Sequence, residues 1–148
     1  MQKAILACVV LAACVQVRER EETSAFMQHG MAEAVQAAVA DVRKAERSRG
    51  PMDISSTSGT TLGKPSTYTA CIEYLKGDAN PRVWAATVAT LSSRLPQFAQ
   101  DAGVHVTLRQ SNSPYHFSMT YTDGRRYGHV VVKVDEGTKR VNVAADES

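Results

Sequence analysis

The chain has 148 residues, of which 43% are hydrophobic and 22% are charged, and these proportions are ordinary for a globular protein. Its 17 basic and 15 acidic side chains leave a formal charge of +2, which argues against the concentrated basic surface that nucleic-acid binding needs. We therefore expect no nucleic-acid partner and, at this length, one domain rather than two.

The first residues have the order of a secretory signal. Lys3 supplies one positive charge, and an apolar run from Ala4 to Ala13 follows it. The run is shorter than the roughly 20 apolar residues that a membrane-spanning helix requires. We therefore predict that residues 1–13 are a signal peptide that is removed on export. The alternatives are an ordinary signal that is cleaved elsewhere, or a buried strand of a cytosolic protein.

Leu11-Ala12-Ala13-Cys14 resembles the lipobox of bacterial lipoproteins, and the resemblance covers about the first 14 residues. It implies diacylglycerol on the Cys14 thiol, cleavage before Cys14, and a fatty acid such as palmitate on the freed amine. Several acyl chains anchor a protein stably where one chain would be marginal. In this family an aspartate after the cysteine favours the inner membrane, so Val15 favours the outer membrane. The resemblance implies a lipid-anchored protein of the bacterial cell envelope that faces the periplasm.

The three cysteines are Cys8, Cys14 and Cys71. Removal of residues 1–13 would take away Cys8 and Lys3, and lipid would occupy Cys14. Cys71 would then have no partner for an intramolecular disulfide, although the periplasm permits one. We favour a buried, inert thiol at Cys71 over an intermolecular disulfide or a reactive thiol.

Residues 14–23 predict a short, charged, lipidated tether, and residues 24–148 predict a single α+β domain. A helix is predicted over 24–49, because Thr23 and Ser24 offer N-cap oxygens and Gly50-Pro51 ends the run of helix formers. One apolar stripe follows helical spacing: Met27, Met31, Ala34, Val35, Ala38, Val42 and Ala45. We favour packing of this stripe on the domain over packing on a partner helix.

Residues 51–67 are rich in Ser, Thr, Gly and Pro and predict a flexible linker ahead of a core over 68–148. Within that core, Tyr68 to Leu75 alternate as in a strand, although the same residues could begin a helix.

Asn80-Pro81 predicts the start of a second helix, with a capping side chain followed by proline at the first helical position. Its apolar stripe consists of Trp84, Val88, Leu91 and Leu95. We expect Trp84 to be a core residue rather than a ligand platform. Pro96 should bend or stop this helix, and Gly103 should cap its end.

Four strands are predicted in the C-terminal part, over 104–109, 115–122, 125–134 and 139–143. Residues 111–114 predict a turn, and Asp123-Gly124 and Glu136-Gly137 predict tight hairpins. We predict that Thr122 pairs with Arg125 and Val134 with Lys139, which places the apolar side chains on one face. The expected fold is two-layer α+β, an antiparallel four-stranded meander packed against one or two helices.

Candidate chemical sites are weak. The predicted register places His116 diagonal to His129, with His105 possible nearby, where imidazoles could bind zinc or copper; a solvated strand face is the commoner explanation. Nothing around Cys71 resembles a cysteine hydrolase, and Glu73 with Asp78 is an equally weak carboxylate pair. We therefore predict no catalytic, metal-binding or cofactor-binding residue.

Arg125-Arg126-Tyr127, at a predicted hairpin tip, are candidate contacts with a partner, because arginine and tyrosine are favoured at protein interfaces. A solubilising turn is the competing explanation, and such a tip could also touch anionic lipid. The function we expect is a non-catalytic envelope lipoprotein that binds a protein, as an assembly factor, inhibitor or surface component. The alternative is a periplasmic metal-binding protein or a small hydrolytic enzyme that uses the His116/His129 face or Cys71.

Overall fold

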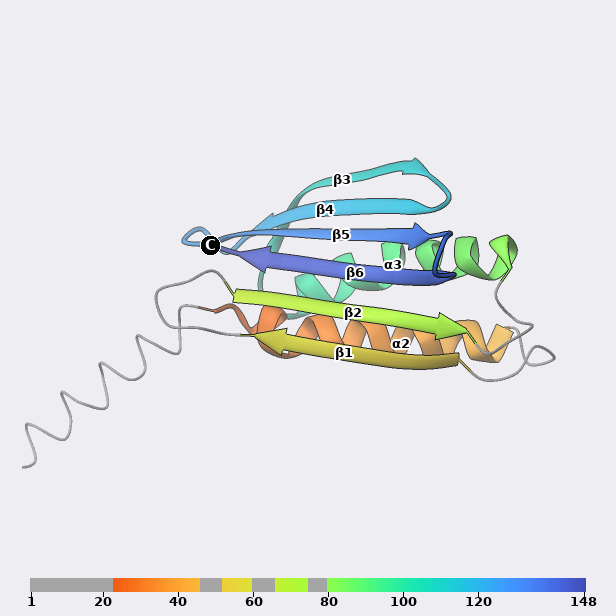
Figure 1. Cartoon of the computed structure of the whole chain (residues 1–148). Helices are drawn as coiled ribbons and strands as arrows, with labels where there is room; N and C mark the ends of the chain where they lie inside the picture. Colours follow the sequence, from red (N-terminus) through yellow and green to blue (C-terminus); the bar gives the residue numbers. More distant parts are fainter. Residues whose placement is uncertain (1–22, 46–51, 60–65, 75–79) are drawn as a thin grey trace, which may run out of the picture.

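The computed structural model describes residues 23–45, 52–59, 66–74 and 80–148, and it has a two-layer α+β fold (Figure 1). Six strands form one antiparallel sheet in the order β1-β2-β6-β5-β4-β3, and the helices lie together on one of its faces. The strands are β1 (Met52–Gly59), β2 (Ser66–Tyr74), β3 (His105–Ser113), β4 (His116–Thr122), β5 (Tyr127–Asp135) and β6 (Arg140–Glu147). The helices are η1 (Phe26–Gly30), α2 (Met31–Ala45) and α3 (Pro81–Asp101).

The predicted signal peptide, the lipobox with Cys14, and the tether up to residue 22 lie outside the described residues. Of the helices in the described part of the chain, none combines the length and the apolar character that crossing a bilayer requires.

The first helix begins where its sequence predicts. Ser24 Oγ accepts a hydrogen bond from the Met27 N–H at 3.1 Å, which satisfies one of the unpaired donors at the helix start. The helix opens with a π-helical turn, η1, closed by a hydrogen bond from the Met31 N–H to the Phe26 carbonyl. This wider turn brings Phe26 into the core beside the predicted stripe. Of that stripe only Ala45 is exposed.

The stripe packs within the domain, as predicted. α2 lies against α3 and β1, and η1 contacts β2 and α3. Asp41 on α2 accepts a hydrogen bond from Arg94 Nε on α3 at 2.8 Å, and Arg94 Nη2 lies 2.7 Å from the same carboxylate oxygen.

The linker predicted over 51–67 is wrong, because β1 occupies Met52–Gly59 and β2 already begins at Ser66. Met52 and Ile54 are the only large apolar residues of β1, yet the strand pairs along its length with β2, from Met52 with Tyr74 to Gly59 with Thr67. β2 itself is a strand, with Tyr68, Ala70 and Ile72 buried as predicted. The sheet therefore has six strands rather than four, with β1 and β2 added beyond β6.

α3 confirms its predicted start and core face. Asn80 Oδ1 accepts from the Val83 N–H at 3.1 Å, Pro81 is the first helical residue, and Trp84, Val88, Leu91 and Leu95 are buried. Gly103, with φ +81°, ends the helix. Pro96 does not stop the helix, which continues to Asp101. Packing of Leu95 and Ala99 in the core stabilises the helix beyond the proline.

Both predicted hairpin registers are wrong by two residues. Thr122 pairs with Tyr127 rather than Arg125, and Asp135 pairs with Arg140, so each loop has four residues instead of two. Because side chains alternate with a period of two, an even shift keeps the same side chains on the core face. The predicted buried face is therefore confirmed, with Phe117, Val130, Val132, Val141 and Val143 all in the core.

β3 departs from the prediction more strongly. It continues to Ser113, where a turn over 111–114 was expected, and it contains register shifts between Val106 and Leu108 and between Gln110 and Ser113. The first shift is by one residue, so it moves Leu108 from the core face to the outer face opposite Thr120. The alternation of Val104, Val106 and Leu108 in the sequence predicts burial of Leu108, but its side chain is accordingly 51% exposed.

Candidate functional site

The loop between β4 and β5, residues 123–126, is held by its own polar groups. Asp123 Oδ1 accepts hydrogen bonds from the backbone N–H of Arg125 at 2.9 Å and of Arg126 at 2.8 Å. Thr122 Oγ1 donates to the Arg126 carbonyl at 2.7 Å and accepts from the Gly124 N–H at 3.0 Å. Gly124 has φ +91°, a conformation that favours glycine. The tip therefore has a defined shape.

Arg126 completes this loop. Its Nη1 lies 2.7 Å from Asp123 Oδ2, and its side chain is only 16% exposed. Burial opposes ionisation of Asp123, but the backbone donors of Arg125 and Arg126 and the Arg126 guanidinium together hold the pKa of this carboxyl below its ordinary value. The negative charge of Asp123, which shapes the loop, is therefore present at neutral pH.

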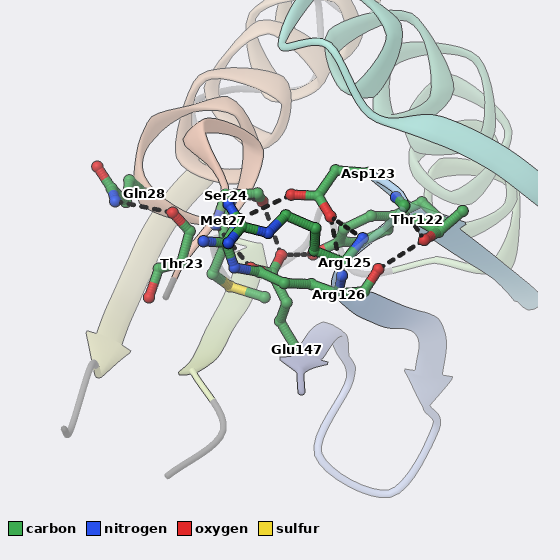
Figure 2. A network of polar contacts seen from close by, with 11 residues as sticks. Thr23, Ser24, Met27, Gln28, Thr122, Asp123, Arg125, Arg126 and Glu147 are labelled. Atoms are coloured by element: carbon green, nitrogen blue, oxygen red, sulfur yellow. Dashed lines mark hydrogen bonds and ion pairs between the residues drawn. The ribbon is translucent and has the colours of Figure 1, made fainter. Parts of the chain in front are cut away.

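Beneath the loop, Glu147 joins the end of β6 to the start of η1 (Figure 2). Its carboxyl group, in a residue 2% exposed, accepts from the Ser24 N–H and Ser24 Oγ, each at 2.6 Å, and from Tyr121 Oη at 2.5 Å. The position also suits an acidic side chain because it lies at a helix N-terminus. Burial first, and then the hydrogen bond and charge of Glu147, raise the pKa of Tyr121, which keeps its hydroxyl a donor.

A cleft of about 510 Å³ opens beside this network. Its walls are the helix start (Thr23, Ser24, Ala25 and Gln28), the end of α3 (Ala102 to Val104) and three residues of the loop (Asp123, Arg125 and Arg126). Ser24 of the network and the loop residues of Figure 2 thus line the same concave surface.

The three predicted contact residues take different positions at this site. Arg125 and Arg126 both line the cleft; Arg125 is exposed, and the Arg126 guanidinium lies against Asp123. Tyr127 is 69% exposed, although its backbone N–H and carbonyl pair with Ser148, each at 2.9 Å. Of the predicted tip, Arg125 and Tyr127 are therefore exposed, and Arg126 shapes the loop.

The corrected register separates the predicted histidine pair. His116 pairs with Lys133 and His129 with Thr120, so the two imidazoles are four strand positions apart, a distance of roughly 13 Å. Across the described residues no group of three or more His, Cys, Asp or Glu is placed to hold a metal ion. Asp78, of the weak carboxylate pair, lies outside the described residues.

Cys71 is half-buried on the sheet face that carries no helix, opposite Asn142 of β6. Burial raises the pKa of its thiol, an effect that Arg140 opposes and Glu73 adds to. A raised pKa lowers the thiolate fraction and with it the nucleophilicity of the sulfur.

Glu147 is the site residue that the sequence reasoning missed. The alternation of β6 offered a signal, since Glu147 follows Val141, Val143 and Ala145 on the core face. No family model, no curated protein and no solved structure matches the chain. The function must therefore be argued from the site itself.

Proposed function

We propose that this protein is a lipid-anchored module of the bacterial cell envelope that binds another protein through the cleft, the loop at 123–126 and Tyr127. The observation that carries the proposal is Tyr127, which is 69% exposed beside a loop that Asp123 holds in one conformation. A large aromatic side chain at the first residue of a strand loses little conformational entropy on binding, and tyrosine and arginine are enriched among the residues that dominate interface energetics.

The position of the tether supports the same role. Thr23, the first described residue, lines the cleft, so Cys14 is separated from the cleft by only the residues in between. Such a segment reaches at most about 30 Å. Lipid on Cys14 would therefore hold the cleft near the membrane surface, where it would meet other envelope proteins. The Val15 that follows the lipobox favours the outer membrane.

The role we propose is non-catalytic. Tyr127, Arg125 and the cleft provide contact area and positive charge, and the network behind them fixes their geometry. An assembly factor, an inhibitor and a surface component are all roles of this kind.

The test is site-specific photocrosslinking in the native envelope. A photoreactive residue at position 127 should yield a discrete crosslinked protein, and a photoreactive residue at Glu136, an exposed position in the β5–β6 loop, should not. Arg125→Glu should reduce the yield at position 127 at least fivefold. The absence of any discrete product at 127, together with unaltered behaviour of the Arg125→Glu protein, would contradict the proposal.

A further inference from the structure

A second candidate surface is the edge of the sheet at β3, one of the two edge strands of the described sheet. β3 pairs only with β4 in the described sheet, so its second side presents backbone donors and acceptors that no described strand satisfies. Beside this edge, a groove of about 420 Å³ runs between β3 and α3. An edge strand with a neighbouring helix groove is the arrangement in which an extended peptide can add a strand and place side chains in a pocket.

The groove is positively charged. Its walls are Pro96 and Gln100 of α3 and the first five residues of β3, His105 to Arg109, and none of them is acidic. Arg109 is exposed and forms no ion pair with any described residue. A carboxylate is therefore the group that would complement this groove.

The register shift in β3 determines where the two side chains that matter lie. Arg109 pairs with Met119, a core-face position, so Arg109 lies on the side of the sheet that α3 covers. Leu108 pairs with Thr120 and lies on the outer face, 51% exposed. Adjacent residues of an added strand also point to opposite faces. A strand laid on β3 would thus offer one side chain to Arg109 and the next to Leu108.

We infer that β3 binds an extended segment of another protein by strand addition, with an acidic residue that pairs with Arg109 next to an apolar residue that contacts Leu108. A second copy of this chain is a poor occupant, because His105–Ser113 contains no acidic residue and would bring a second Arg109 to the same seam. The inference rests on the proposed protein-binding function and adds the chemistry of the partner segment at a surface separate from Tyr127.

A synthetic nine-residue peptide tests the inference with the full chain, lipid-anchored in nanodiscs. The peptide alternates threonine and valine and carries one central glutamate in a threonine position; its glutamine and lysine analogues are the controls. The glutamate peptide should bind and shift the backbone amide signals of β3 and of Gln100. The glutamine analogue should bind at least tenfold more weakly.

Charge exchange separates an ion pair from a general effect. Arg109→Glu should weaken binding of the glutamate peptide at least tenfold and restore binding of the lysine analogue. Arg43→Glu, a change at an exposed arginine of α2, should do neither. Leu108→Asp should weaken all the peptides. Because Leu108, Arg109 and Arg43 are exposed, the urea midpoints of these variants should match that of the parent protein.

Equal binding of the glutamate and lysine peptides, amide shifts confined to 123–127, or self-association through β3 would each overturn the inference. Failure of the proposed function gives a different result, because the crosslink from position 127 would then be absent in the otherwise unaltered protein. A position 127 crosslink that persists while the glutamate peptide fails to bind would overturn the β3 inference alone.

Discussion

At the scale of single residues, Glu147 is the side chain on which the site depends. Three donors converge on its buried carboxyl group, and two of them come from Ser24 at the start of the first helix. Glu147→Ala would leave these donors buried without an acceptor, so we expect the free energy of unfolding to fall by about 3 kcal/mol or more. Urea denaturation of the purified protein and of the variant measures this loss of unfolding free energy.

Two further variants make this prediction specific. Glu147→Gln keeps the shape and one acceptor oxygen, so its cost should be about half as large. Asp146→Ala changes the neighbouring exposed carboxylate and should cost less than about 0.5 kcal/mol. Equal losses for Glu147→Ala and Asp146→Ala would show that the buried network does not stabilise the domain.

Tyr74 gives the fold a dependence on alkaline pH. Its hydroxyl donates to Thr87 Oγ1 at 2.8 Å, and burial raises its pKa from 10.0 to about 12, although the hydrogen bond to Thr87 lowers it. Above pH 10 the unfolded tyrosine ionises while the folded one stays protonated. The contribution of the protonated Tyr74 to the free energy of unfolding is therefore complete below pH 10 and is lost as the pH rises towards 12. The free energy of unfolding falls by about 3 kcal/mol over this range.

Urea unfolding between pH 8 and about 11 follows this loss. Tyr74→Phe should flatten the decline but not abolish it, because the pKa of Tyr121 is also raised by burial. The exposed Tyr127 serves as the control, and Tyr127→Phe should keep the parent slope. If the free energy of unfolding of Tyr74→Phe fell with pH as steeply as that of the parent protein, Tyr74 would not be the source of the pH dependence.

At the scale of elements, the contact between β4 and β5 requires a glycine. Tyr121 lies across Gly128, its partner in the register, and a Cβ built on Gly128 would fall 1.9 Å from Tyr121 Cζ. The same ring contacts Phe26 edge to face, with centroids 5.1 Å apart. Gly128→Ala would displace Tyr121 from its contact with Phe26 and from its hydrogen bond to Glu147. It should cost at least about 3 kcal/mol of unfolding free energy.

Gly137→Ala is the matched control, because a Cβ there meets only Asp135 Oδ1 at 3.4 Å, and it should cost less than about 0.5 kcal/mol. In the Tyr121→Ala background the space is open, so Gly128→Ala should cost far less than in the parent protein. Additive losses in this double-mutant cycle would disprove the steric explanation.

The sequence predicts these elements well wherever one periodic pattern suffices. Both hairpin registers were wrong by two residues, yet the buried face was right, because an even shift preserves alternation. The inward position of Leu108 was wrong because a one-residue bulge reverses the faces, and β1 was missed because Met52 and Ile54 are its only large apolar residues. Pairing with neighbouring strands decides both features, and a local pattern does not contain that information.

At the scale of the whole molecule, the features of the site lie at one end of the sheet. The start of η1, the end of α3, the 123–126 loop and the end of β6 meet around the cleft. Arg125, Arg126 and Tyr127 were predicted from the sequence for this end. The structure adds Asp123, which holds the loop, and Glu147, which joins β6 to the start of the first helix. The groove at β3 escaped sequence reasoning because it depends on the bulge.

The last prediction concerns the proposed lipid anchor on Cys14. If lipid on Cys14 holds the protein, the mature chain should begin at Cys14 and carry the mass of a diacylglycerol and of a further acyl group, which mass spectrometry of the native N-terminus measures. High salt should leave the protein on the membrane and detergent should release it, because burial of acyl chains rather than charge holds it there. Replacing residues 1–14 with a signal that is cleaved directly before Val15 should move the protein to the soluble periplasmic fraction, whereas Cys71→Ser should stay bound. A native chain that keeps Met1, or that salt alone releases, would remove the membrane from the proposed function and leave the cleft and the β3 edge to be tested as surfaces of an unanchored protein.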